Sequence, residues 1–135
     1  DPEAVEVHRR PRPPLEQGVA AVAAGVTAML DISDGLLRDA GRIARASGVI
    51  LDLDPTALED DIDRLAPTLG GDVARACVLA GGEEHSLLAT FPPGCVPPGW
   101  RLIGVVRGLA GGEEPQVLVG GLRESLTGWD HFRPY

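Results

Sequence analysis

The stretch from residue 27 to residue 46 constrains the fold more than any other part of the sequence. A short apolar run at 27–32 (Ala28, Met29, Leu30 and Ile32) is followed directly by apolar positions at helical spacing. The run predicts a buried strand, and Ser33 and Asp34 after it supply the chemistry of a helix N-cap. A strand that turns at once into a helix predicts a helix packed on a sheet.

The helix expected to run to about residue 46 has two distinct faces. Its apolar positions are Leu36, Leu37, Ala40, Ile43 and Ala44, the spacing of one helical face. We expect the charged residues on the opposite, solvent-facing side: Arg38, Asp39, Arg42 and Arg45. Gly48 is well placed to end this helix, and residues 49–53 predict the next strand.

The remaining pattern alternates helices and strands. A first helix is expected at 15–25, and Pro67 is expected to end a polar helix at 56–67. A further helix at 70–80 would turn Val73, Ala76, Cys77 and Leu79 inward. Strands are expected at 86–91, 102–106 and 116–119. This order predicts an α+β domain over residues 15–135, with helices packed against a mixed β-sheet, after a proline-rich linker at 1–14.

Composition narrows the class of protein. The 135 residues suit one domain, and 44% hydrophobic with 4% aromatic residues implies a core of Ala, Val, Leu and Ile. A net charge of -8 argues against nucleic-acid binding but allows a nucleotide whose phosphates magnesium screens. Two cysteines, no apolar run long enough for a membrane span and no visible signal peptide favour the cytoplasm.

The most informative chemistry lies where the first strand meets its helix. Asp31 and Asp34 would face opposite sides of a regular strand, but a turn at Ser33–Gly35 could bring both carboxylates to one point beside the free N–H groups of the helix. Hard oxygen ligands beside a phosphate pocket are typical of a magnesium–nucleotide site. Simple helix capping explains the motif about as well. The place of Asp31 at the end of an apolar strand favours a cation, since a buried acid needs a partner.

Two further segments carry candidate ligand contacts. Gly81-Gly82-Glu83-Glu84-His85 could present carboxylates at a sheet edge, although an ordinary loop with solvated acids explains it more simply. His85 could act as a base, but a lone histidine is more often structural. In Gly128-Trp129-Asp130-His131-Phe132, Trp129 could stack on a flat heterocycle or simply anchor the tail to the core.

Together these segments resemble the C-terminal domain of thiamine-monophosphate kinase, in the AIR synthetase-like superfamily. The resemblance extends along nearly the whole chain. It comprises His8-Arg9-Arg10-Pro11-Arg12-Pro13, Met29-Leu30-Asp31-Ile32-Ser33-Asp34-Gly35-Leu36, Ala46-Ser47-Gly48-Val49, Gly81-Gly82-Glu83 and Gly128-Trp129-Asp130-His131-Phe132. The order and spacing of these motifs are specific in combination, although no single one decides.

The resemblance implies transfer of a phosphoryl group from ATP to thiamine monophosphate, giving thiamine diphosphate. It implies that Asp31 and Asp34 bind Mg²⁺, that Ser33 contacts ATP, and that Glu83 and Trp129 contact thiamine monophosphate. It also implies an N-terminal domain that carries most of the magnesium ligands and forms a homodimer. Since that domain is outside these 135 residues, the chain alone is expected to show no kinase activity.

Alternatives remain at this point. The family usually reads Gly-Gly-Glu-Asp-Tyr-Glu-Leu-Leu, whereas Glu84, His85 and Ser86 replace Asp-Tyr-Glu here. These departures would suit a degenerate ligand-binding module that keeps the fold without catalysis. Another enzyme of the superfamily, such as an AIR synthetase or a selenophosphate synthetase, is the second alternative. The Gly-Trp-Asp-His-Phe tail argues against it.

Overall fold

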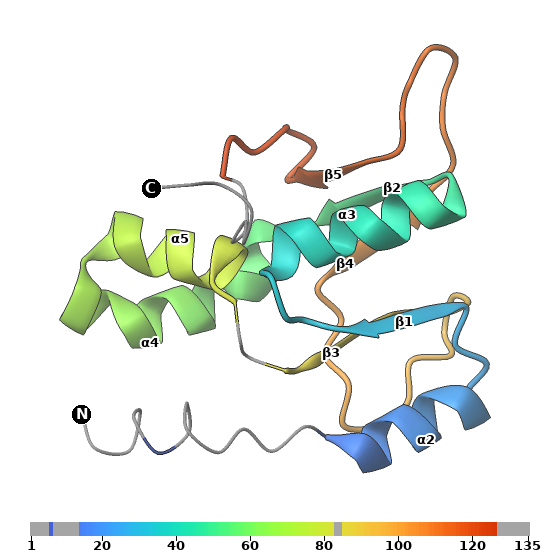
Figure 1. The fold of residues 1–135 in the computed structure, drawn as a ribbon, viewed down its shortest axis with the longest axis horizontal. Coiled ribbons are helices and arrows are strands. Elements are labelled where there is room, and N and C mark those ends of the chain that lie inside the picture. The colour runs from blue at the N-terminus through green and yellow to red at the C-terminus, as the bar shows by residue number, and fades with distance from the viewer. Residues whose placement is uncertain (1–5, 7–13, 83–84, 127–135) are drawn as a thin grey trace.

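The computed structural model describes residue 6 and residues 14–82 and 85–126. These residues form helices and short strands in mixed order (Figure 1). The helices are α2 (Leu15–Ala23), α3 (Leu36–Ser47), α4 (Glu59–Leu69) and α5 (Gly71–Ala80), with a 3₁₀ turn at Pro55–Leu58. The strands are β1 (Ala28–Asp31), β2 (Ile50–Leu53), β3 (Leu87–Thr90), β4 (Gly104–Arg107) and β5 (Gln116–Val119).

The strands form two small sheets. Strands β1 and β3 pair antiparallel, with Asp31 opposite Leu87. In the second sheet β2 lies in the middle, antiparallel to β4 and parallel to β5. A sheet with both kinds of pairing, covered by helices, confirms the predicted α+β class.

Helix α3 is the centre of the core. It packs against β1, β2, β5 and α5, and Figure 1 shows it in front of β2, with the β1–β3 pair below it. Leu36, Ala40 and Ile43 on this helix are buried against Leu51, Val119 and their neighbours. As predicted, the Gly48 backbone is left-handed (φ 65°), and this residue ends the helix as its C-cap. The β1–α3 turn is therefore fixed to the most buried helix of the fold.

Three details of the sequence prediction are wrong. Strand β1 is not fully buried, because its residues alternate between half-buried and exposed and Met29 is 37% exposed. Pro67 does not end α4, which continues to Leu69. Pro67 lies in the last turn, where its ring removes one hydrogen bond from an exposed helix end. Strand β4 begins at Gly104 and not at residue 102.

Helix α5 also turns a different face to the core than expected. Ala74 and Leu79 are its buried residues, whereas Val73 is 52% exposed and Cys77 is exposed. The helix packs on α4 and α3 at the same time, so its buried stripe is set by two neighbours. Within the described ranges, no helix is both long and apolar enough to cross a membrane. Apart from residues 6 and 14, the predicted linker lies outside the described residues.

Candidate functional site

The β1–α3 turn lies directly against the loop that joins α5 to β3. The backbone N–H of Ile32 donates to the carbonyl oxygen of Ser86 (2.7 Å), and the N–H of His85 donates to the carbonyl oxygen of Ile32 (3.0 Å). These bonds extend the β1–β3 pairing beyond the strands themselves. Two of the three segments that the sequence singled out are therefore neighbours in the fold.

Two glycines make this close approach possible. Gly35 has a φ of 109°, a backbone conformation open almost only to glycine, and a Cβ there would lie 2.7 Å from the carbonyl oxygen of Ala80. A Cβ on Gly82 would lie 2.7 Å from the carbonyl oxygen of Ser33. The end of α5 and the β1–α3 turn thus pack backbone to backbone.

The start of α3 is held differently from the prediction. Neither Ser33 nor Asp34 caps the helix: Gly35 is the N-cap residue, and no described side chain makes a capping bond there. Instead Asp39, from the first turn of α3, reaches back. Its Oδ2 accepts the backbone N–H groups of Ser33 and Asp34, each at 2.9 Å. Asp39 is fully buried, not on the solvent face as expected.

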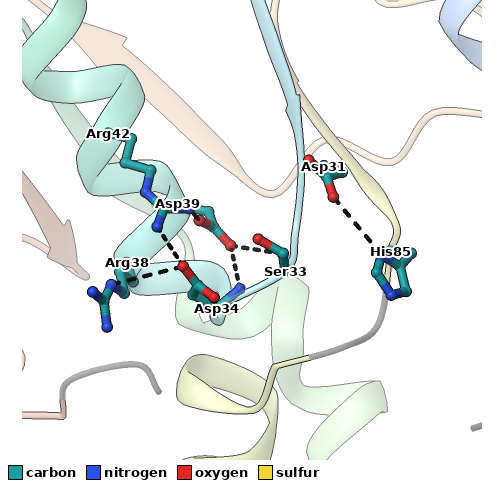
Figure 2. Close-up of polar contacts among 7 residues, drawn as sticks. All are labelled: Asp31, Ser33, Asp34, Arg38, Asp39, Arg42 and His85. Carbon is teal, nitrogen blue, oxygen red and sulfur yellow. Dashed lines mark hydrogen bonds and ion pairs between the residues drawn. The ribbon is translucent and has the colours of Figure 1, made fainter. Parts of the chain in front are cut away.

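Arg42 joins the two acids of this turn. Its guanidinium donates to Asp39 Oδ1 and to Asp34 Oδ2 (Figure 2). Arg38 Nε lies 3.9 Å from the same Asp34 oxygen, and the Asp34 side chain is only 13% exposed. The pKa of Arg42 is raised above its ordinary value, chiefly because Arg42 donates to Asp34. The Asp34 carboxylate is thus neutralised by protein cations in this structure.

Asp31 lies in a separate environment. Its side chain is 58% exposed, and its Oδ2 is 3.7 Å from His85 Nδ1. Figure 2 shows Asp31 directed toward His85 and Asp34 toward the arginines of α3. The expected convergence of the two carboxylates on one point is therefore wrong. The arginines draw Asp34 to the helix, while β3 brings His85 to the other side of the turn.

His85 occupies an unusual backbone position. Its φ of 55° makes it the one non-glycine residue with positive φ among the described residues, a region that costs most side chains energy. This conformation accompanies the contact with Asp31. The imidazole faces Asp31, and the His85 side chain is 40% exposed.

The arrangement fits a divalent cation in part. Asp31 offers an exposed carboxylate, and Asp34 offers one that Arg42 would have to share or release. In the part of the chain that the structure describes, no cluster of three or more His, Cys, Asp or Glu could hold a metal by itself. Mg²⁺ commonly takes one or two carboxylates and completes its shell with phosphate oxygens and water, so the exposed Asp31 carboxylate suits a cation as the side chains stand, and Asp34 would join it only after leaving Arg42. Glu83 and Trp129 lie outside the described residues.

Comparison with known proteins gives a consistent result, although no family model matches the chain. A thiamine-monophosphate kinase of Mycobacterium tuberculosis is 50% identical over 129 residues, 93% of this chain and 37% of the relative. One from Corynebacterium glutamicum is 42% identical over 76% of this chain and 31% of the relative. This chain is homologous to part of the thiamine-monophosphate kinases. It spans little more than a third of the length of these curated relatives.

Solved structures of thiamine-monophosphate kinases have the same fold. A structure described as AaThiL complexed with AMPPCP and TMP matches with a TM-score of 0.78 at 29% identity, over 95% of this chain and 40% of that one. A crystal structure of thiamine monophosphate kinase from Aquifex aeolicus matches with a TM-score of 0.71 at 27% identity, over 90% of this chain and 40% of that one. The AIR synthetase-like fold expected from the sequence is confirmed.

The resemblance to thiamine-monophosphate kinases did not point to Asp39 and Arg42. A signal for Asp39 was present: it lies three residues after Leu36 and four before Ile43, both buried, so helical geometry assigns it to the core face. A buried acid needs hydrogen-bond donors, and the turn it faces supplies two. The signal for Arg42 is the same i, i+3 spacing from Asp39.

Proposed function

We propose that this chain forms the C-terminal part of a thiamine-monophosphate kinase. The reaction moves the terminal phosphoryl group of ATP to a phosphate oxygen of thiamine monophosphate, which leaves ADP and thiamine diphosphate. The observation that supports this most is the backbone-to-backbone junction of the β1–α3 turn with the Gly81–His85 segment. This junction unites two family motifs in a chain 50% identical to a kinase of this name.

Asp31 and Asp34 are the proposed Mg²⁺ ligands. The exposure of Asp31 supports its assignment, because a cation can reach its carboxylate without displacing a strong partner. For Asp34 the cation would compete with Arg42, which already neutralises the same oxygen. Bound Mg²⁺ would supply charge neutralisation to the phosphates, the main requirement of phosphoryl transfer.

Ser33 is the proposed contact to ATP, and Glu83 and Trp129 are the proposed contacts to thiamine monophosphate. Ser33 stands in the turn that precedes α3, whose N-cap residue, Gly35, has no side chain to cap the helix. Unbonded N–H groups at a helix start favour phosphate oxygens. No protein nucleophile is required, since positioning and electrostatics carry most of phosphoryl transfer.

The proposal includes a second domain and a dimer. In the relatives, well over half of the length lies outside the matched region. We infer that an N-terminal domain supplies further magnesium ligands, that the complete protein is a homodimer in the cytoplasm, and that the 135 residues alone do not turn over.

One observation favours a second candidate, a ligand-binding module without catalysis. His85 contacts Asp31, one of the proposed metal ligands, and the family usually has a tyrosine at this position. A protonated imidazole there would compete with the cation for Asp31.

The test is an assay of the complete gene product and of the 135-residue chain with ATP, Mg²⁺ and thiamine monophosphate. Thiamine diphosphate is measured by chromatography, with the substrates of AIR synthetase and selenophosphate synthetase as parallel arms. The proposal predicts thiamine diphosphate from the complete gene product and none from the chain. Binding of thiamine monophosphate without turnover would favour the binding module, and turnover of another substrate would favour that enzyme.

A further inference from the structure

The most deeply buried charged side chain in the described part of the fold belongs to Asp39. Its exposure is 0%, and both of its oxygens are occupied. Oδ2 accepts the backbone N–H groups of Ser33 and Asp34 at 2.9 Å each, and Oδ1 accepts from Arg42. A carboxylate is costly to bury, and a buried one with three donors is held in a defined geometry.

The two N–H groups that Asp39 holds belong to the residues proposed to contact ATP and Mg²⁺. Since neither residue caps α3, the helix does not fix the conformation of the Ser33–Asp34 backbone by capping. Asp39 does this from inside the core, five and six residues further along the chain. Through these two hydrogen bonds, the carboxylate therefore fixes the position of the turn relative to α3.

We propose that Asp39 is a positioning residue, which holds the Ser33–Asp34 backbone so that the Asp34 carboxylate and the Ser33 hydroxyl meet Mg²⁺ and nucleotide in the correct orientation. This inference rests on the proposed function for its consequence, but not for its geometry. Asp39 itself touches neither metal nor substrate. Loss of Asp39 would displace the turn, so the affinity of the site for the cation should fall more than the maximal rate does.

Two substitutions separate the roles of Asp39. In Asp39→Asn the carbonyl oxygen of the side chain can still accept both backbone N–H groups, whereas the amide NH2 replaces the oxygen that accepts from Arg42, so the hydrogen bond and the ion pair with Arg42 are lost. In Asp39→Ala both functions are lost. Should Asp39→Ala fail to fold, Asp39→Ser takes its place, because its hydroxyl is polar but too short to hold both amides.

A matched control is available in β2. Asp52 also accepts a backbone N–H with its carboxylate, from Gly121 at 2.9 Å, but it lies away from the β1–α3 turn. Asp52→Asn therefore removes a carboxylate that supports a turn elsewhere. It should leave the magnesium dependence of the complete gene product unchanged.

The first experiment measures the Mg²⁺ concentration that gives half-maximal thiamine diphosphate formation by the complete gene product. Asp39→Ala should raise it by about tenfold or more, and Asp39→Asn should stay within about threefold of the unsubstituted protein. A role in stability alone would lower the rate in proportion to the folded fraction, with no change in the half-saturating concentration. That result would overturn the proposal while leaving the proposed function intact.

The second experiment needs no activity. Amide hydrogen exchange of Ser33 and Asp34 is followed in the 135-residue chain. Both amides should be strongly protected in the unsubstituted chain and in Asp39→Asn, and should lose at least about tenfold of that protection in Asp39→Ala or Asp39→Ser. Absence of protection in the unsubstituted chain would contradict the positioning role directly. If the gene product lacks kinase activity, the proposed function fails, and this exchange still decides whether Asp39 holds the turn.

Discussion

Two regions of this molecule use the same set of contacts in different surroundings. At the β1–α3 turn, Asp39 accepts from an arginine and from backbone N–H groups while fully buried. In the loop between β4 and β5, Glu113 accepts from both terminal nitrogens of Arg107 at 2.8 Å and from the N–H of Ala110 at 2.7 Å. That loop extends away from the rest of the fold (Figure 1).

We call a carboxylate that accepts from an arginine and from backbone N–H groups a carboxylate clamp. The difference between the two regions shows what burial adds to such a clamp. At the surface, water can replace each partner of Glu113, so the clamp shapes the loop but adds little to stability. In the core, water does not reach the Asp39 carboxylate, which is 0% exposed, so loss of its partners would leave an uncompensated buried charge. The Glu113 carboxylate therefore only shapes its own loop, whereas the Asp39 carboxylate fixes the backbone of the candidate site.

The largest expected effect comes from removing each carboxylate in turn. Asp39→Ala should lower the free energy of unfolding of the chain by about 4 kcal/mol, because it leaves the backbone N–H groups of Ser33 and Asp34 without their acceptor. Glu113→Ala should shift the urea midpoint far less. Equilibrium urea unfolding of both variants makes the comparison. Equal losses would mean that burial does not distinguish the two clamps.

Gly35→Ala tests the close packing around the buried clamp. An alanine at this position would have to adopt a backbone φ of 109°, and its Cβ would lie 2.7 Å from the carbonyl oxygen of Ala80. We therefore expect the free energy of unfolding to fall by about 3 kcal/mol. Gly48→Ala is the matched control, since Gly48 is also left-handed but has nothing within 4 Å of its Cβ position. It should cost about 1 kcal/mol. A Gly35→Ala variant no less stable than the control in urea unfolding would contradict the packing argument.

Much of the fold followed from sequence because local signals and tertiary contacts agree there. The helix at α3, its glycine stop and the strand that precedes it were predicted from spacing alone, and the mixed sheet is confirmed. The end of α4 was missed since Pro67 normally stops a helix, whereas in a last exposed turn it removes a single bond.

The site was predictable in place but not in geometry. The sequence identified the Asp31–Gly35 turn and the Gly81–His85 segment, which the structure brings together. It could not reveal that Arg42 draws Asp34 away from Asp31, because a charged side chain of α3 can reach either solvent or the turn. Asp39 was assigned to the solvent face because it is charged, although its spacing from Leu36 and Ile43 places it on the core face.

Arg42→Gln sharpens the account of the buried region. If Arg42 competes with the cation for Asp34, its removal should lower the half-saturating Mg²⁺ concentration of the complete gene product by about 30-fold, because one unit charge about 4 Å from a divalent cation in water contributes about 2 kcal/mol. Arg42→Lys keeps the charge and should behave like the unsubstituted protein. An unchanged or higher requirement for Mg²⁺ in Arg42→Gln would mean that Arg42 supports the metal site.

The smallest effect concerns acid stability of the surface clamp. The hydrogen bonds from Arg107 lower the pKa of Glu113 from 4.5 to about 2. The charged form is thus favoured in the folded chain, so its stabilising contribution is present above pH 4.5 and is lost as the pH falls toward 2. The difference in urea midpoint between the unsubstituted chain and Glu113→Gln should be constant above about pH 5 and should shrink below pH 4.5. A difference that persists undiminished at pH 2 would contradict this assignment.

The most direct test of the central claim is thiamine diphosphate formation by the complete gene product with Asp31→Asn, measured across a Mg²⁺ titration. Asp63→Asn, which alters an exposed acid of α4, is the control. Loss of a metal ligand worth about 3 kcal/mol predicts a fall of about 10²-fold in kcat/KM for Asp31→Asn, with Asp63→Asn near the unsubstituted rate. Equal rates in the two variants at every Mg²⁺ concentration would contradict a catalytic site at the β1–α3 turn.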